Sequence, residues 1–330
     1  MILVTGGAGY IGSHMVYLLS QKGFDVVVLD NLEKGHRAAV MGAKFYQGDL
    51  RDKELLDRIF AENDVEAVIH FAAASLVGES MENPLKYYFN NVYGTMCLVE
   101  AMIKHGVKKL VFSSTAAVYG EPKNIPIMEE DPTVPTNPYG ETKLAIEKML
   151  KWADMAYGLK YVSLRYFNVA GAHCDGVIGE DHQPETHLIP IVLQVALGKR
   201  DKVVIYGDDY DTPDGTCIRD YIHVLDLCEA HLLALKYIQQ KGKSDVFNLG
   251  NGMGFSVKEV IDKAQKVVGR NIRYEVGKRR PGDPSILVAS DKKAKEVLNW
   301  EPKYSSLETI IDTAWKWHSA HPDGYDVDKP

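Results

Sequence analysis

Residues 2–14 read ILVTGGAGYIGSH, an apolar run followed by a turn with glycines at positions 6, 9 and 12. Side chains at these positions would hold phosphate oxygens away from backbone N–H groups, and the N-terminus of the helix that follows favours negative charge. Asp30 ends the next apolar run about 20 residues further on, where a carboxylate can accept hydrogen bonds from ribose hydroxyls. This spacing predicts a dinucleotide site, and a tight turn without a ligand is the alternative.

The residues after the second predicted strand bear on the kind of dinucleotide. Asp30-Asn31 favours NAD, because the carboxylate would repel a 2′-phosphate and no arginine directly follows it. Lys34 and Arg37 lie slightly further along and leave NADP open at this point. Asp49, after the third predicted strand, is expected to border the adenine, although it could equally cap the helix that follows.

Strand-like and helix-like segments alternate through the first half of the chain. Nearly continuous apolar runs, expected where both faces of a sheet are buried, occupy residues 26–29, 67–71 and 110–112. The alternation predicts an α/β fold with a Rossmann-type doubly wound parallel sheet. We expect a NAD-binding domain at 1–168, with returning segments near 218–250, and a smaller α/β substrate-binding lobe mainly at 169–330.

Composition excludes several classes of protein. The 330 residues include 38 basic and 45 acidic ones, and the net charge of −7 disfavours a general nucleic-acid binder. No apolar run approaches a membrane span. Four widely spaced cysteines without a CxxC pair argue against a disulfide framework or a zinc knuckle and favour a cytoplasmic protein. His173, His182, His187 and Cys174 match no common zinc spacing, so we expect no metal.

A tyrosine and a lysine form the candidate catalytic pair. Pro138 predicts a helix start, which places Tyr139 and Lys143 at i and i+4 on one helical face. A nearby cation favours phenolate, so we expect Lys143 to lower the pKa of Tyr139. An exposed tyrosine beside a solvated lysine would show the same spacing. Thr115, however, follows a predicted strand at the carboxyl edge of the same sheet, where ligands of open α/β folds bind.

The glycine turn, the strand-end hydroxyl and the YxxxK motif stand in the order of the extended short-chain dehydrogenase/reductase superfamily, which the chain resembles. Within it the chain is most similar to the 4-epimerases of UDP-galactose and UDP-glucose. The supporting stretches span nearly the whole chain and include VIHFAA (68–73), FSSTAAVYG (112–120), NPYGETK (137–143), LRYFNVAGAH (164–173), DGTCIRDYIHVLDL (214–227) and RRPGD (279–283). Related dehydratases carry an acidic residue just after the strand-end hydroxyl, whereas this chain has Ala116-Ala117.

The resemblance implies a mechanism. Tyr139 would remove the proton of the sugar 4-hydroxyl while C4 delivers hydride to tightly held NAD, Thr115 would bond the same oxygen, and Lys143 would bridge the nicotinamide ribose. The resulting 4-ketose would turn about its diphosphate linkage and receive the hydride on its other face. The reaction would therefore involve no net redox change.

The resemblance also implies binding residues. Those for the cofactor are Gly6, Gly9, Tyr10, Ile11, Gly12, Asp30, Asn31, Asp49, Leu50, Phe71, Ala72, Ala73, Asn90, Tyr139, Lys143 and Phe167. Those for the UDP-sugar are Thr115, Asn168, His187, Leu188, Val204, Tyr206, Arg219, Tyr221, Arg280 and Asp283. Each has an ordinary structural alternative, such as sheet core for the two phenylalanines or a turn position for Asn168.

The sequence leaves alternatives open for the range of substrates and for whether the protein is an enzyme. Ser75, His187 and Leu287 depart from the residues common in the family and would surround the hexose, so N-acetylated sugars remain candidates. A 4-epimerase of a UDP-N-acetylhexosamine, UDP-pentose or UDP-uronate is one alternative. A non-catalytic NAD-binding regulator on the same fold is another. The resemblance further implies a homodimer packed through residues 84–105 and 139–157.

Overall fold

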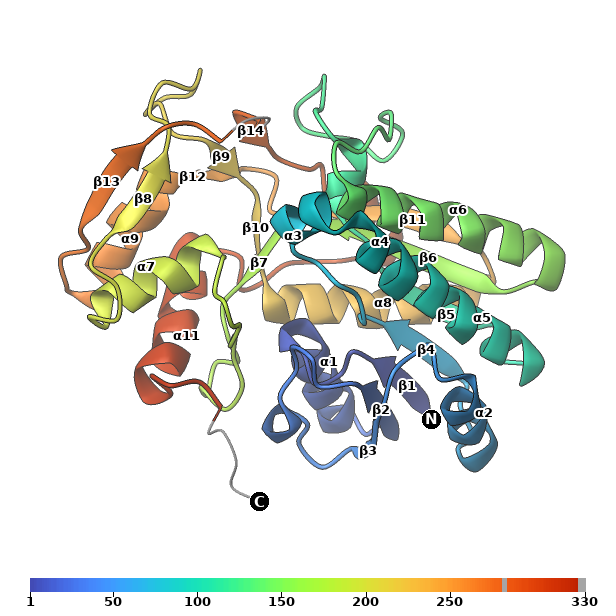
Figure 1. Ribbon diagram of the computed structural model, residues 1–330. Helices are drawn as coiled ribbons and strands as arrows, with labels where there is room; N and C mark the ends of the chain where they lie inside the picture. Colours follow the sequence, from blue (N-terminus) through green and yellow to red (C-terminus); the bar gives the residue numbers. More distant parts are fainter. Residues whose placement is uncertain (281–283, 326–330) are drawn as a thin grey trace.

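A seven-stranded parallel sheet organises the computed structural model, which describes residues 1–280 and 284–325. Its strand order is β11-β6-β5-β4-β1-β2-β3 (Figure 1). Its strands are β1 (Ile2–Thr5), β2 (Val26–Asp30), β3 (Lys44–Gln47), β4 (Ala67–His70), β5 (Lys109–Ser113), β6 (Lys160–Tyr166) and β11 (Asp245–Leu249). This doubly wound parallel sheet confirms the predicted fold class.

Helices cover both faces of this sheet, and others build the second lobe. The helices are α1 (Tyr10–Gln21), α2 (Lys53–Glu62), α3 (Val77–Glu82), α4 (Pro84–Tyr87), α5 (Gly94–Lys104), α6 (Pro138–Tyr157), α7 (Leu188–Ala196), α8 (Val224–Lys241), α9 (Val257–Val268), α10 (Lys292–Leu298) and α11 (Leu307–Ala320). Short helical turns are η1 (Arg37–Ala39), the π-helical η2 (Tyr88–Tyr93) and η3 (Ala116–Tyr119). The stretch expected to be one helix from 84 to 105 is thus α4, η2 and α5 in succession.

Side chains from successive strand residues enter two different cores. Val4 of β1 packs in the core that α1 and α8 cover, whereas Leu3 packs in the core that α2, α5 and α6 cover. In β2, Val28 likewise packs in the first of these cores and Val27 in the second. Because side chains alternate between the faces of a strand, continuous apolar runs are what a sheet covered on both sides requires.

The chain returns to the sheet after leaving it. β11 pairs with β6 in parallel, with Phe247 opposite Leu164, and α8 packs beside α1 on one face. β10 (Tyr221–His223) instead pairs with β7 (Asn168–Ala170) in a separate two-stranded sheet. The expected domain boundary after residue 168 stays a prediction.

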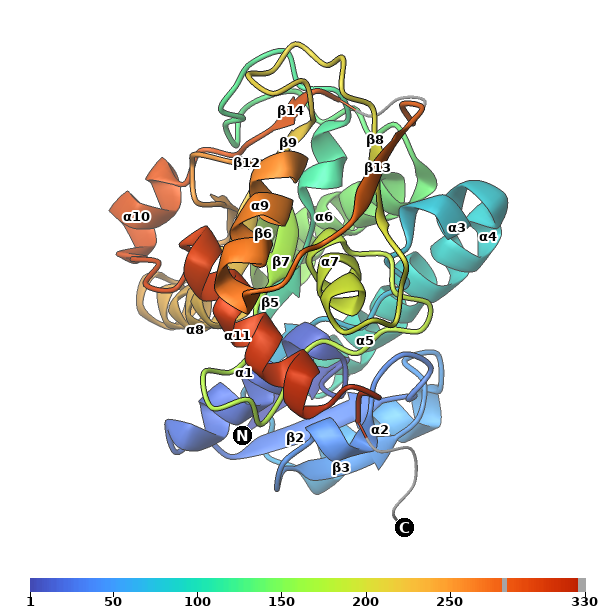
Figure 2. The ribbon, with the colours of Figure 1, turned by 90° about the vertical axis from the view of Figure 1, so that its left-hand side faces the viewer.

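The second lobe has its own apolar core, formed where α7, α9 and α11 pack together (Figure 2). Its remaining strands are β8 (Val203–Tyr206), β9 (Ile218–Arg219), β12 (Phe255–Ser256), β13 (Tyr274–Gly277) and β14 (Ile286–Leu287). They form a three-stranded sheet of order β12-β9-β14 and a two-stranded sheet of β13 and β8. The lobe lies beside the carboxyl ends of the main strands (Figure 1).

Two expectations drawn from composition can be compared with the structure. Among residues 1–280 and 284–325, no helix combines the length and apolar character that crossing a bilayer requires. All four cysteines lie in the described part of the chain, and no disulfide joins them.

Candidate active site

Two glycines in the turn between β1 and α1, Gly6 and Gly12, leave no room for a side chain. Gly6 has a φ of +73°, and a Cβ there would lie 2.6 Å from the backbone nitrogen of Ala72. A Cβ at Gly12 would lie 2.0 Å from the carbonyl oxygen of Gly6. Gly9 is the N-cap of α1, and among the described residues no side chain caps that helix start. These open N–H groups suit the diphosphate of a dinucleotide.

Asp30 is fixed directly beside this turn. Its carboxylate accepts hydrogen bonds from the backbone N–H groups of Ala8 (2.9 Å) and Leu32 (2.8 Å). Burial raises the pKa of Asp30, while these backbone N–H groups oppose the shift. A carboxylate has further lone-pair capacity, which is available to a ribose hydroxyl. The turn and the carboxylate together fit an adenosine dinucleotide.

Asp49 lies next to Asn31 at the same edge of the sheet. The Asn31 amide donates to the Asp49 carboxylate at 3.2 Å, and the Arg51 guanidinium donates to both carboxylate oxygens at 2.6 Å. The bonds from Arg51 lower the pKa of Asp49. The N-cap of α2 is Asp52, so the alternative role of Asp49 as a helix cap is excluded.

The loop after β4 crosses the glycine turn. Phe71 and Ala72 both donate their backbone N–H groups to the Thr5 carbonyl, at 2.9 and 3.1 Å. The Phe71 ring packs 4.7 Å from the ring of His231, between centroids, and Phe71 borders the sheet core. Ala73 follows in the same loop.

Asn91 is a residue that the sequence analysis did not single out. It is buried, its amide oxygen accepts from the Ala74 N–H at 2.8 Å, and its NH2 group donates to the Ala74 carbonyl at 3.0 Å and to the Thr142 hydroxyl at 3.1 Å. The predicted cofactor residue Asn90 donates to the Asn91 amide oxygen at 3.1 Å. Asn91 thereby joins the loop after β4 to α6.

The start of α6 places Tyr139, the candidate catalytic tyrosine. The Asn137 side chain caps this helix by accepting from the Gly140 N–H at 2.9 Å, and Pro138 occupies its first turn. Burial raises the pKa of Tyr139, and a hydrogen bond with the Thr115 side chain lowers it. Thr115, which follows β5, is buried and caps η3. The structure therefore brings the phenol and the strand-end hydroxyl together.

Lys143 lies one helical turn from Tyr139 and is buried. Its Nζ donates to the Ser113 carbonyl at 2.7 Å and lies 5.9 Å from the centroid of the Tyr139 ring. Burial lowers the pKa of Lys143 to about 7, against an opposing attraction to Glu147. We expected Lys143 to lower the pKa of Tyr139. Instead Thr115 has this effect, because Lys143 is directed to a backbone carbonyl and burial weakens its hold on a proton.

A buried ion pair lies one helical turn beyond Lys143. Glu147, a further turn along α6, accepts from the Ser114 hydroxyl at 2.5 Å and from two nitrogens of Arg165 on β6 at 3.0 and 2.5 Å. Arg165 also donates to the Tyr119 hydroxyl at 2.8 Å. The i, i+4, i+8 spacing of Tyr139, Lys143 and Glu147 was visible in the sequence, but the partner on β6 was not.

Three of the predicted substrate residues make contacts with neighbouring groups. The Asn168 amide donates to the Asp220 carbonyl at 3.2 Å. The Arg280 guanidinium stacks 3.9 Å above the ring of Tyr206. Arg219 donates to the Ile218 carbonyl at 2.8 Å.

Further predicted substrate residues, the predicted cofactor residue Phe167 and the specificity position Leu287 are distributed between the two lobes. Tyr221 is buried in β10, and burial raises its pKa. Phe167 and Leu287 pack against the same small cluster around Ala116. Leu188 begins α7, Val204 lies in β8, and Asp283 falls outside the described residues.

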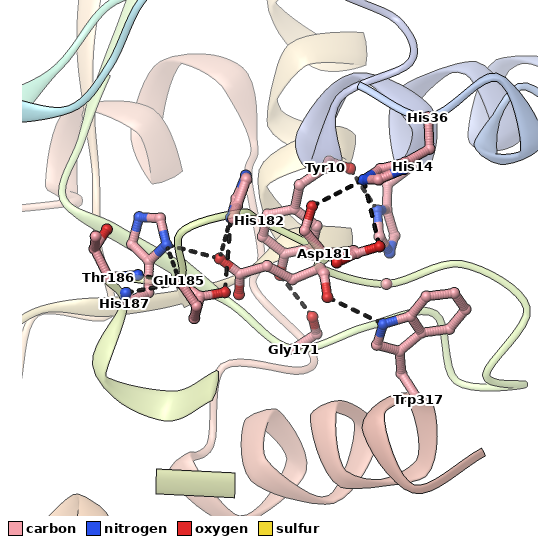
Figure 3. Close-up of polar contacts among 12 residues, drawn as sticks. Tyr10, His14, His36, Gly171, Asp181, His182, Glu185, Thr186, His187 and Trp317 are labelled. Carbon is pink, nitrogen blue, oxygen red and sulfur yellow. Dashed lines mark hydrogen bonds and ion pairs between the residues drawn. The ribbon is translucent and has the colours of Figure 1, made fainter. Parts of the chain in front are cut away.

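His187 precedes α7 and meets two acidic side chains. Its Nδ1 lies 2.9 Å from a Glu180 carboxylate oxygen and 3.1 Å from one of Glu185 (Figure 3). Burial opposes its charge, but the attraction of Glu180 and bonds to both carboxylates raise the pKa of His187 to about 10. The sequence analysis named the histidine but neither glutamate, although the EDHQPETH stretch (180–187) shows their spacing.

Comparison with known proteins assigns this arrangement to a family. The profile of the NAD dependent epimerase/dehydratase family matches residues 2–250. The chain belongs to that family. A UDP-glucose 4-epimerase of Halalkalibacterium halodurans is 62% identical to it over 327 residues, which are 99% of this chain and 98% of the relative.

Solved structures of family members agree with the fold. A crystal structure of a UDP-glucose 4-epimerase, 60% identical, covers 99% of each chain with a TM-score of 0.97. A UDP-glucose 4-epimerase from Brucella ovis in complex with NAD is 48% identical and covers 95% of this chain and 97% of its own, with a TM-score of 0.93. The likeness therefore extends over both lobes.

Proposed function

We propose that this chain interconverts UDP-galactose and UDP-glucose by transient oxidation at C4 with tightly bound NAD. The observation that carries the proposal is the contact of Tyr139 with Thr115, one turn from the buried Lys143, in a family whose members use NAD. Ala116-Ala117 after the strand-end hydroxyl leaves no acid at that position to eliminate water from a 4-keto sugar. We therefore expect the hydride to return to C4 of the 4-keto sugar.

The chain's own groups supply the proton chemistry. Tyr139 takes the proton of the sugar 4-hydroxyl, and the Thr115 hydroxyl holds the same sugar oxygen. Lys143 donates to the Ser113 carbonyl, and with the dinucleotide bound it would bridge the nicotinamide ribose. The glycine turn and the Asp30 carboxylate hold the dinucleotide, which supplies a hydride acceptor and donor when bound.

Two arginines of the lobe are proposed to bind the diphosphate. A guanidinium presents a planar fork of donors that matches paired phosphate oxygens. Arg280 is oriented by its stacking on Tyr206, and Arg219 lies at the end of β9 beside Asp220. Because the chain carries a net charge of −7, such a local cationic site is needed to attract a UDP-sugar.

The direct test is to incubate the purified protein with UDP-galactose, adding no cofactor, and to follow the nucleotide sugars by proton NMR. We expect UDP-glucose to accumulate to a constant ratio without stoichiometric NADH, because the cofactor is regenerated in each turnover. UDP-N-acetylglucosamine, a UDP-pentose and a UDP-uronate are tested in parallel. Absence of conversion of UDP-galactose, even with added NAD, would remove the assignment.

We also propose that two chains pack as a homodimer through α4, η2, α5 and α6. Large apolar side chains are exposed on these elements, notably Leu85 (78%), Trp152 (65%) and Met155 (70%). α6 packs beside α4 and η2, so these side chains belong to neighbouring elements. An apolar surface of this kind is typical of an interaction site.

Sedimentation tests the dimer. We expect the unmodified chain to sediment as a dimer and Leu85→Glu to dissociate it, because a carboxylate would be buried in an apolar interface. Met253→Glu, at a 74% exposed side chain in a loop of the other lobe, is the matched control and should leave the dimer intact. A monomeric unmodified chain at working concentration would contradict the proposal.

A further inference from the structure

Four side chains of one loop converge outside the catalytic pair. Glu180, His182, Glu185 and His187 each offer an atom to a group in which all these atoms lie within 4.8 Å of one another. Both carboxylates are almost fully buried, each with a side-chain exposure of 4%. Figure 3 shows His182, Glu185 and His187 directed toward one another on the stretch before α7.

The spacing within the cluster suits one small cation. His182 Nδ1 lies 3.1 Å from Glu180 Oε1 and 3.9 Å from Glu185 Oε2, and His187 Nδ1 lies 2.9 Å from Glu180 Oε1 and 3.1 Å from Glu185 Oε1. Ligands held at 2.0–2.1 Å in a tetrahedron are about 3.4 Å apart. Three of these four separations are shorter than that value and the one to Glu185 Oε2 is longer, so binding an ion requires small movements of these side chains.

Charge balance allows one divalent ion to take the place of two protons. Two buried carboxylates need two positive charges nearby, since an unpaired buried charge is costly. If both histidines supplied them, two imidazolium rings would lie with centroids 5.2 Å apart and aim at the same Glu180 oxygen. One divalent ion balances both carboxylates while both rings stay neutral, and so removes this repulsion.

The cluster is held by further contacts. Glu185 Oε1 accepts from the backbone N–H groups of Thr186 (2.7 Å) and His187 (2.8 Å), and the Trp317 indole of α11 donates to the Glu180 carbonyl at 3.1 Å. The Tyr10 ring of α1 meets the His182 ring edge-on, with centroids 6.2 Å apart. Partners of this kind orient ligands in metal sites.

We propose that Glu180, His182, Glu185 and His187 bind one divalent transition-metal ion of the Zn²⁺ class. Imidazole nitrogens and carboxylate oxygens are ligands that zinc accepts, and four of them match its usual coordination number. The ion joins a loop that contacts both α1 and α11, so its role is to stabilise the junction of the two lobes. The sequence-based expectation of no metal considered the spacing of His173, His182, His187 and Cys174. It did not consider Glu180 and Glu185.

Zinc retention tests the site without reference to catalysis. The untagged full chain is treated with a chelator, exchanged into chelator-free buffer, titrated with Zn²⁺ by calorimetry, and analysed for metal after desalting. We expect about one equivalent to be retained. We also expect Zn²⁺ to raise the midpoint of thermal unfolding, because it binds the folded chain.

His182→Gln removes one ligand and should weaken Zn²⁺ binding at least about tenfold, since even the loss of an outer partner has that effect. His105→Gln is the matched control, because His105 contacts only Asp57 among the described acidic side chains and lies outside the cluster. Circular dichroism and NAD content confirm folding of each variant.

Two results would overturn the proposal. One is retention of less than about a tenth of an equivalent by the unmodified chain, which would show a network of ion pairs instead. The other is equal zinc affinity of His182→Gln and the unmodified chain. If His182→Gln fails to fold, Co²⁺ added to the unmodified chain decides: intense visible bands of tetrahedral Co²⁺ support the site, and weak octahedral bands contradict it.

Discussion

Tyr139 is the residue on which the proposed proton transfer depends. Its hydroxyl contacts Thr115, and its aromatic ring lies beside Lys143. Tyr139→Phe keeps the ring and removes only the hydroxyl. We therefore expect NAD to stay bound and the rate of epimerisation to fall by about 10²- to 10⁴-fold, which is the usual contribution of general acid–base catalysis. Nucleotide-sugar NMR measures the rate, and absorbance of the released cofactor measures NAD. Full activity in this variant would contradict the catalytic role.

Thr115 gives a second prediction at the same scale. Its hydrogen bond lowers the pKa of Tyr139 against the effect of burial. Thr115→Val removes the hydroxyl but keeps the side-chain shape, so the pKa of Tyr139 should rise. The rising limb of kcat/KM with pH should move to higher pH, and the rate should fall by about 10²-fold. Thr115→Ser is the matched control and should keep most of the activity. An unshifted pH profile in Thr115→Val would be evidence against this contact.

Among the secondary-structure elements, α6 carries two of the proposed catalytic residues, Tyr139 and Lys143. Asn137 caps that helix and Pro138 follows, so Tyr139 lies in its first turn. Asn137→Ala should lower the free energy of unfolding by about 1 kcal/mol and reduce kcat, because the first turn would fray. Urea unfolding and NMR assays measure the two effects.

Ser306→Ala provides the comparison for this helix cap. Ser306 caps α11 by accepting from the Thr309 N–H at 3.1 Å, far along the chain from Tyr139. We expect a similar loss of stability with kcat unchanged. Equal losses of kcat in the two cap variants would mean that general stability, and not the placement of Tyr139, decides the rate.

Across the whole molecule, Asp220 joins segments that are distant in sequence. Its carboxylate accepts from the backbone N–H groups of Asn251 (2.8 Å) and Ala289 (3.2 Å), and its carbonyl accepts from the Asn168 amide. Burial raises the pKa of Asp220 to about 6, with these N–H groups opposing and Asp291 adding to the shift. The folded chain thus holds this proton at pH values where the unfolded chain has lost it.

This difference predicts a pH dependence of stability. Between about pH 4 and 6 the native state binds more protons at Asp220 than the unfolded state, so the unfolding free energy from this group falls as pH rises. The decline should amount to about 3 kcal/mol. Asp220→Asn should remove it, and urea unfolding of both chains at pH 4, 5, 6 and 7 gives the difference. Parallel pH profiles of the two chains would contradict the raised pKa.

The parallel sheet, the glycine turn and the helix that carries Tyr139 could all be predicted from the sequence. Continuous apolar runs, the spacing of the glycines at positions 6, 9 and 12, and the i, i+4 spacing of Tyr139 and Lys143 all depend on residues within a few positions of each other. Such local patterns can be read from a sequence because the backbone geometry of one helix, strand or turn sets the spacing of their residues. The family resemblance then added the candidate binding residues.

Only the tertiary structure decided which side chains meet across the chain. It showed that Asn91 bonds Ala74 in the loop after β4, and that Arg165 pairs with Glu147. It also showed that Thr115, rather than Lys143, lowers the pKa of Tyr139. It also showed that four side chains of residues 180–187 converge on one another. The physical reason is that these contacts, and the burial that sets each pKa, arise from packing between elements, which no local periodicity encodes.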